Sequence, residues 1–400
     1  MQPNLSQNKN RIESIDIVRG LVMLIMALDH VRDYIHSTSV TEDPLNLQTT
    51  TPILFFTRWI THFCAPTFVF LSGSSIYLQS LRKTKKELSS FLIKRGLWLI
   101  FAEFFIISLG WTFNPFYNAI PLQVIWAIGI SMVILGICIK LPLKFIFAIG
   151  LTIVLFHNLL DIPESAKDFK AGFWWDLLHH GNFVPYQFAP NHFILIVYPF
   201  LAWTGWMMLG YCFGIFFGPT YTSQQRKSIF IKMGVAVLLF FIVLRYSNFY
   251  GDPFPWSSEK NTVLSIFSFI KVHKYPPSLL YLCMTIIPVL FLLAYLEHIK
   301  NWFTNILVVY GRTAFFYYIL HIYLIHLICT INFFANGHTV AEAIKSMPNY
   351  PFLFQLPGDG YSLGIVYLVW VFVIIALYPI CNWYDQYKRA HKEKWWLSYL

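Results

Sequence analysis

The residues that could carry chemistry first appear together near the N-terminus, in the stretch IDIVRGLVMLIMALDHVRDYIH. Its centre is apolar enough for a lipid bilayer, yet its ends hold Arg19, Asp29, His30, Arg32 and Asp33. Ionisable groups inside a membrane are costly and usually mark a functional site. A histidine near carboxylates suits general acid–base chemistry at neutral pH, and an arginine suits an anionic ligand.

Helical geometry predicts that Arg19 and His30 share a face. Eleven residues of α-helix correspond to about 1,100° of rotation, close to three turns, and to about 16 Å of rise. Asp33 follows His30 by three residues and joins this face, while Met23 and Met26 line it in between. Such a face suits a ligand that is anionic at one end and reactive at the other, and a CoA thioester has this shape.

Plainer interpretations remain open for the same residues. Arg19 could extend to the headgroups at a membrane interface, and His30 could pack between helices with a hydrogen bond to a neighbour. Asp29 and Arg32 point away from the face of Arg19 and can pair with each other, because they lie three residues apart.

A second apolar stretch, RWITHFCAPTFVFLSGSSIYL, carries Arg58 and His62 four residues apart, on one helical face. Gly73 lies eleven residues after His62, so the small residues LSGSS lie on this face and would let another helix or a ligand approach closely. The alternative is that Arg58 only anchors the helix to headgroups.

A late apolar stretch, GRTAFFYYILHIYLIH, places Arg312 and His326 fourteen residues apart, about 1,400° of helical rotation, which puts them on one face. His321 lies about 180° from Arg312 on the same helix, and we expect it to be a core histidine. Glu103 lies in the middle of another apolar run, and we expect an arginine from a different helix to pair with it.

The elements that must position these residues are membrane-spanning helices. The chain of 400 residues is 57% hydrophobic and 12% charged, with a mean hydropathy of +0.56. A soluble domain carries about 25% charged residues. We therefore predict one integral membrane domain over residues 1–400, an all-α polytopic bundle. Its ten predicted spans lie near 16–36, 53–79, 96–111, 120–139, 143–159, 192–217, 231–247, 277–298, 305–331 and 361–384.

The distribution of lysine and arginine predicts that both termini are cytoplasmic. Of these 29 residues, five lie within or at the edges of the spans, 18 lie in loops on the side of the termini, and six lie in loops on the other side. The same distribution explains the net charge of +10 without a nucleic-acid partner. The long loops are then external, and we expect them to fold over the outer end of the bundle. They are 37–52, 160–190, 248–276 and 332–360.

Several site types are not expected. The six cysteines lie in or beside apolar runs without CxxC spacing, which is typical of packing residues rather than disulfides or metal ligands. HExxH, P-loop and GxGxxG motifs are absent, and LSGSS lies in the wrong context for a nucleophile elbow. We therefore expect no metal site.

Together, SIDIVRGLVMLIMALDH, RWITHFCAPTFVFLSGSSIYL and the late stretch GRTAFFYYILHIYLIH resemble the heparan-alpha-glucosaminide N-acetyltransferase catalytic-domain family. Within the wider superfamily, the bacterial membrane acyltransferases that modify polysaccharides are similar in having an arginine, ten residues and then a histidine, which here are Arg19 and His30. The resemblance implies a bacterial inner-membrane enzyme that moves an acyl group, most simply acetyl, from cytoplasmic acyl-CoA to a sugar or amino-sugar acceptor near the outer face. A homodimer is compatible with it.

The sequence departs from the lysosomal member of this family, where an asparagine stands in the place of His30 and the proposed catalytic histidine lies in the following loop. That loop, STSVTEDPLNLQTTTP, contains no histidine here. The heparan substrate is therefore not carried over, and the catalytic role is assigned to His30.

The hypothesis is acyl transfer with His30 as general base, Asp29 or Asp33 fixing its tautomer, and Arg58 or a backbone N–H stabilising the oxyanion. Direct attack and an acyl-histidine intermediate both fit it. The catalytic candidates are His30, Asp29, Asp33, Arg58 and His62, and the candidates for binding acyl-CoA are Arg19, Arg95, Arg312 and His326.

The main alternative is a multi-pass transporter or flippase, in which the polar faces would line a substrate path. Discontinuous helices and internal symmetry would support it, and the sequence shows no internal repeat, although GRT could break the ninth helix. A structural membrane protein would explain the external loops but not the Arg19–His30 face.

Overall fold

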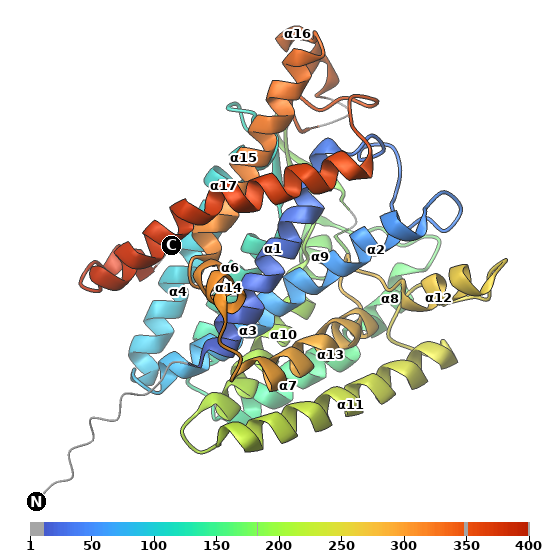
Figure 1. Cartoon of the computed structure of the whole chain (residues 1–400). Coiled ribbons are helices and arrows are strands. Elements are labelled where there is room, and N and C mark those ends of the chain that lie inside the picture. Colours follow the sequence, from blue (N-terminus) through green and yellow to red (C-terminus); the bar gives the residue numbers. More distant parts are fainter. Residues whose placement is uncertain (1–11, 182, 348–350, 399–400) are drawn as a thin grey trace, which may run out of the picture.

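The computed structural model describes residues 12–181, 183–347 and 351–398 (Figure 1). The N-terminal part of the predicted cytoplasmic side, residues 1–11, lies outside the described residues. The described chain is an all-α helix bundle with one small sheet, as the composition predicts for the helices. The longer helices are α1 (Glu13–Ile35), α3 (Cys64–Ser80), α4 (Lys85–Ala102), α6 (Val124–Cys138), α7 (Leu143–Phe156), α10 (Phe200–Phe213), α11 (Ser223–Ser247), α13 (Leu279–Leu296), α14 (Trp302–Arg312), α15 (Ala314–Ala335) and α17 (Leu363–Ala390). The shorter helices are α2 (Pro52–Ile60), α5 (Ser108–Thr112), α8 (Asp161–Glu164), α9 (Phe173–Leu178), α12 (Thr262–Ile270) and α16 (Val340–Ser346).

Within the described residues, seven helical segments are long and apolar enough to cross a membrane: Pro52–Ser80, Leu143–Glu164, Phe200–Phe217, Ser223–Ser247, Leu279–Leu296, Ala314–Ala335 and Leu363–Ala390. The other predicted spans correspond to α1 and α4, which carry more ionisable residues, and to α6, an apolar helix of 15 residues. The number of ten spans therefore stays a prediction.

Local sequence signals explain where the helices begin. The hydroxyl of Thr84 accepts from the backbone N–H of Glu87 and the Glu87 carboxylate accepts from the backbone N–H of Thr84, so α4 starts with a capping box. Thr222 and Gln225 do the same for α11. Pro52 occupies the first position of α2, where its missing N–H is not needed.

Three helical segments are interrupted. The 3-10 turn η1 (Thr61–Phe63) joins α2 to α3, and the π-helix η2 (Glu103–Ile107) joins α4 to α5. Thr313, with φ −109° and ψ 22°, separates α14 from α15. The predicted span 305–331 therefore consists of two helices that meet within GRT, the sequence at which a break was considered possible.

A three-stranded sheet was not predicted. It comprises β1 (Ala119–Leu122), β2 (Pro185–Ala189) and β3 (His192–Ile196), in the order β1-β3-β2, with β3 parallel to β1 and antiparallel to β2. Two predicted spans, 120–139 and 192–217, actually begin as strands. Their β-branched apolar residues fit either interpretation, so hydropathy alone extended the helices too far.

The described parts of the long loops pack at one end of the bundle, which we call the loop end (Figure 1). The fully buried Arg245 at the end of α11 holds the loop 248–276 by donating to the carbonyl oxygens of Phe254, Ser268, Phe269 and Lys271 at 2.6–2.9 Å. A bridge between His36 and Tyr361 ties the end of α1 to the loop before α17.

Helix α1 lies at the centre, packed against α14, α15, α17 and α3 (Figure 1). Glycines permit the closest approach. A Cβ added at Gly20 would lie 1.9 Å from the carbonyl oxygen of Leu307, and a Cβ at Gly311 would lie 1.9 Å from that of Asp16. The backbones of α1 and α14 therefore touch, which fixes the faces that α1 presents to its other neighbours.

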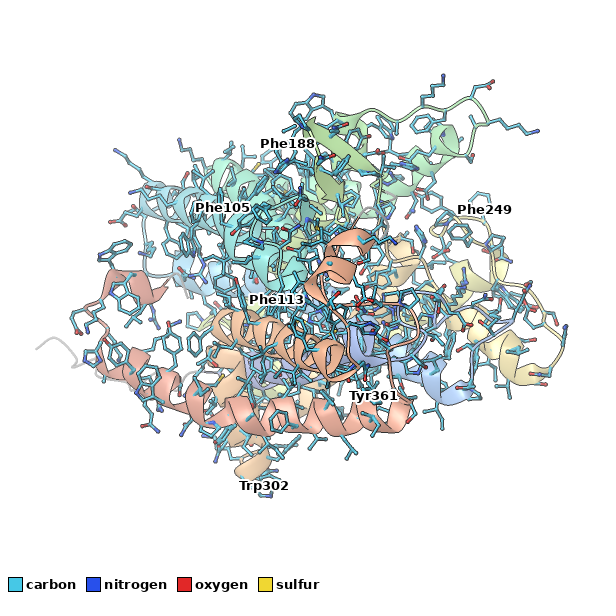
Figure 2. All side chains as sticks on the ribbon, turned by 90° about the horizontal axis from the view of Figure 1, so that it is seen from above. Phe105, Phe113, Phe188, Phe249, Trp302 and Tyr361 are labelled. Carbon is cyan, nitrogen blue, oxygen red and sulfur yellow. The ribbon has the colours of Figure 1, made fainter. Side chains whose placement is uncertain are left out.

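Large apolar side chains also cover the outside, as expected for a surface in contact with lipid. In Figure 2, Phe249 and Trp302 lie at the edge of the molecule, and they are 86% and 75% exposed. Much of α11 and α17 is exposed along its length despite its apolar sequence. The composition and this distribution together define an integral membrane protein.

Candidate active site

A cavity of about 800 Å³ opens at the end of the bundle opposite the loop end. Eight cationic side chains and one carboxylate, Asp385, lie in its wall, and we call this opening the basic mouth. The cations come from α1, α4, α14, α17 and the segments after α3 and α17: Arg19, Lys83, Arg95, Arg312, Lys388, Arg389, Lys392 and Lys394. Such a concentration of positive charge is suited to an anionic ligand with several phosphates.

The inner part of the cavity is mostly apolar. Arg19, Met23 and Met26 lie in one wall, in agreement with the face predicted from helical spacing. Residues of α3, α4, α6 and α15 complete it, including Phe68, Leu99, Ile128 and Phe315. A charged opening followed by an apolar channel matches a ligand with a polar head and a thin, less polar arm.

Two arginines at the mouth are held in place by protein groups. Arg19 donates to the hydroxyl oxygen of Ser75 at 2.7 Å and to the carbonyl oxygen of Gly311 at 3.4 Å. Arg312 lies 3.6 Å from Asp16 and 3.9 Å from Asp385. Both guanidinium groups are therefore oriented before any ligand arrives, which lowers the entropic cost of binding.

Tyr318 lies in the cavity wall and also beside a pair of buried histidines. Its ring centroid is 6.2 Å from that of His30 and 5.4 Å from that of His321. Trp111 packs edge-on against His30, with the ring centroids 4.8 Å apart. Tyr318 thus lies between the cavity and the histidine pair, while His30 and His321 themselves do not line the cavity.

The histidine pair has a defined tautomer. His321 Nδ1 lies 3.0 Å from the carbonyl oxygen of Tyr317, which can only accept, so Nδ1 of His321 carries the proton. Its Nε2 then accepts from Nδ1–H of His30 across 2.7 Å. Nε2 of His30 is left with a lone pair, and no described residue hydrogen-bonds it. This is the arrangement of a histidine prepared to take a proton.

Four charged residues form a cluster next to His30. Asp29 accepts from Arg32 at 2.9 Å and from Arg58 through its other oxygen, and Arg32 also donates to Asp33 at 2.6 Å. The predicted Asp29–Arg32 pair is confirmed. The two aspartates are engaged by arginines, so the prediction that one of them fixes the tautomer of His30 was wrong, and His321 occupies that place.

Like His30, the predicted site histidines His62 and His326 lie outside the cavity wall. His62 is in the turn η1, its Nδ1 is buried without a hydrogen-bond partner among the described residues, and its ring faces Tyr281 at 5.5 Å. The ring nitrogens of His326 lie 3.0 and 2.8 Å from the carbonyl oxygens of Gly110 and Leu353. The turns at η1 and Thr313 break the helical phase from which both positions were predicted.

The expected arginine partner of Glu103 was also wrong. Glu103 is fully buried and accepts from the backbone N–H groups of Gln123 and Trp126, at 3.0 and 2.9 Å. These N–H groups lie at the start of α6, where they have no acceptor within the helix and where a carboxylate is stabilising. Glu103 therefore caps a neighbouring helix.

Three parts of the candidate site were not predicted from the sequence: His321, Tyr318 and the basic segment 388–394. A signal existed for the tail, because KRAHKEK is strongly basic, but it was assigned only to membrane orientation. His321 could not be recognised as a site residue, because its direction was calculated from Arg312 on one continuous helix, and the chain turns between them at Thr313.

Fold and site together define an integral membrane helix bundle with a basic mouth and a buried histidine pair. The sequence profile of the family described as heparan-alpha-glucosaminide N-acetyltransferase, catalytic, matches residues 11–248. The chain belongs to this family and is a membrane acetyltransferase. None of the curated proteins matches it. The matched range covers α1 to α11 and thus holds Arg19, His30, Arg58 and Arg95, whereas His321 and the basic tail lie beyond it.

Proposed function

We propose that the protein transfers an acetyl group from acetyl-CoA, bound in the cavity, to a sugar or amino-sugar acceptor that approaches from the loop end. His30 is the general base. The observation that carries the proposal is the continuity between the basic mouth and Tyr318, which lies against the histidine pair.

The mouth would hold the phosphates of CoA, and the apolar channel would hold the pantetheine arm. Arg19 and His30 are separated by about 16 Å along α1, a span suited to an extended pantetheine chain. The distribution of basic residues supports a cytoplasmic location for the mouth, where acyl-CoA is made, with both termini on that side.

In the proposed reaction, a lone pair on the acceptor's oxygen or nitrogen attacks the thioester carbon. Nε2 of His30 takes the proton from this hydroxyl or amine during the attack. The tetrahedral intermediate then expels the CoA thiolate, which receives the proton from His30. The hydrogen bond from Nδ1–H to His321 stabilises the imidazolium that forms in between. Arg58, held against Asp29 beside His30, is the cation that we assign to the oxyanion.

The test compares two acetyl donors, acetyl-CoA and S-acetylpantetheine, which has the same thioester but no phosphates. Arg95→Gln and Lys392→Gln should each weaken acetyl-CoA binding about tenfold and leave the use of S-acetylpantetheine unchanged. Lys86→Gln is the matched control, because Lys86 lies on α4 but outside the cavity wall.

Equal losses for both donors would contradict the assignment of the phosphates to the mouth. Purified protein that neither binds CoA nor transfers acetyl groups would overturn the enzyme proposal, and it would favour a transporter that uses the same polar faces.

A further inference from the structure

A second cluster of ionisable residues lies at the end of α7, away from the cavity. It brings together His157 of η3 (His157–Leu160), Asp161 and Glu164 of α8, and His179, which follows α9. None of the four lines the cavity. His157 and His179 are 3% and 0% exposed, and their ring centroids lie 5.5 Å apart inside the protein.

The tautomer of His179 is fixed from one side. Glu164 Oε1 lies 2.9 Å from Nδ1 of His179 and also accepts from the indole N–H of Trp175 at 2.7 Å. Nδ1 of His179 therefore carries a proton, and in the neutral imidazole its Nε2 presents a lone pair. A histidine that donates one ring N–H to a carboxylate and turns its other nitrogen inward has the usual arrangement of a metal ligand.

Distances around that lone pair match metal coordination. Nδ1 of His157 lies 3.3 Å from Nε2 of His179, which is long for a hydrogen bond. Two imidazole nitrogens bound to one tetrahedral Zn²⁺ at 2.0–2.1 Å are separated by about 3.4 Å. Asp161 Oδ1 lies 3.9 Å from the same Nε2, so it needs to move by about half an ångström to complete three ligands.

The carboxylate of Asp161 is held for this role by Asn158. The amide nitrogen of Asn158 donates to Oδ2 of Asp161 at 2.7 Å, which leaves Oδ1 toward the histidines. The amide oxygen of Asn158 accepts from the backbone N–H of Leu279 at 2.8 Å, so the start of α13 fixes the orientation of the amide.

Charge gives an independent reason for a cation. Glu164 and Asp161 have side-chain exposures of 8% and 18%, and within the described residues neither is paired with a lysine or arginine. Two such carboxylates with neutral histidines leave an uncompensated negative charge, which is costly away from water. A divalent cation would neutralise it.

From this geometry we infer a zinc-type metal site with His157 Nδ1, His179 Nε2 and Asp161 Oδ1 as ligands and Glu164 orienting His179. Possible ligand atoms of Asp161, Glu164 and His179 lie within 4.8 Å of one another, and His157 Nδ1 lies 3.3 Å from His179 Nε2. The metal would join the end of α7 to the segment 161–179 and, through Asn158, to α13. Its role is to stabilise the loop end, separately from acetyl transfer.

The test uses the full chain, purified in detergent with a tag that contains no histidine and stripped with EDTA. Zn²⁺ is added, excess is removed, and bound zinc is measured per chain by mass spectrometry, with affinity from competition against a chromophoric chelator. The variants are His179→Gln, His157→Gln and Asp161→Asn. His180→Gln is the matched control, because His180 is adjacent but contacts Asp176 at 2.7 Å.

We expect one zinc per chain and a rise in Tm with zinc for the parent and His180→Gln, with affinity at least tenfold weaker in the other three variants. Parent protein that retains no stoichiometric zinc, or variants that bind it as tightly as the parent, would overturn the inference. Should His179→Gln not fold, Asp161→Asn decides, since that side chain is partly exposed. Zinc content does not depend on turnover, so an inactive parent would not affect this result.

Discussion

Nδ1 of His30 lies 2.7 Å from Nε2 of His321, and the backbone carbonyl of Tyr317 fixes which of the two donates. In the proposed mechanism, this contact between α1 and α15 takes the place of the histidine–carboxylate pair of other acid–base sites. A neutral partner stabilises the imidazolium less than a carboxylate would. In the proposed mechanism, an imidazolium that is stabilised less returns its proton more readily to the leaving thiolate.

The first prediction concerns His321 as a positioning residue. His321→Ala should lower turnover by about 10- to 100-fold, because His30 loses the partner that fixes its tautomer, while acetyl-CoA affinity should stay within twofold. His321→Gln should recover part of the rate, since its amide oxygen can accept from His30.

The matched control is His326→Gln, on the same helix but bound to the carbonyl oxygens of Gly110 and Leu353. It should lower Tm without a selective loss of turnover. If His321→Ala lowers Tm and turnover in the same proportion as His326→Gln does, then His321 only packs.

The sequence predicted the α1 site better than the rest because α1 is one uninterrupted helix. Arg19, Met23 and Met26 lie in one wall as their spacing requires. Positions counted across η1 or Thr313 failed, because a turn of unknown angle resets the helical phase. His321 could therefore be found only once α15 was placed against α1.

Ten apolar runs were readable from hydropathy, and each corresponds to a helical segment or to a helix preceded by a strand. What hydropathy could not show was tertiary pairing. The partner of Glu103 is the backbone at the start of a helix, and no side chain in the sequence indicates that pairing. His157 and His179 lie 22 positions apart in the sequence and meet only in the folded chain.

The second prediction concerns the buried ion cluster. Asp29→Asn should destabilise the protein by about 3 kcal/mol or more, because two arginines lose their shared carboxylate. Asp33→Asn should cost about 1 kcal/mol or less, since Asp33 has a side-chain exposure of 37% and, among the described residues, forms an ion pair with Arg32 alone. Thermal or denaturant unfolding in detergent measures both, and equal effects would contradict the central place of Asp29.

The third prediction concerns the contact between α1 and α14. Gly20→Ala should destabilise the protein by at least 1–3 kcal/mol, because the added methyl meets the carbonyl oxygen of Leu307. Gly172→Ala is the control, with nothing within 4 Å of its added Cβ and an ordinary φ of −104°. A Gly20→Ala variant as stable as Gly172→Ala would show that the helices do not touch there.

The fourth prediction is a pH dependence at the loop end. Hydrogen bonding to Asp359, at 2.9 Å, raises the pKa of His338 above its ordinary 6.5, and the nearby Glu342 adds to the shift. A raised folded-state pKa means that this contribution to stability is complete below about pH 6.5 and is lost as pH rises through the folded pKa.

Relative to the parent, His338→Gln should therefore have its largest loss of Tm below about pH 6.5, and the difference should shrink at higher pH. Tm of both proteins across the pH range measures this. A difference that grows with pH would contradict the assigned sign.

The central claim is that His30 takes the acceptor proton while CoA is held elsewhere, and a rate and affinity measurement on His30→Ala tests it most directly. At matched expression and Tm, acetyl transfer from acetyl-CoA should fall by a factor of about 100 to 10,000, because the base is gone. Acetyl-CoA affinity should change less than twofold, because the basic mouth lies about three helical turns away. Normal turnover in His30→Ala, or a loss of CoA affinity as large as the loss of rate, would contradict the claim.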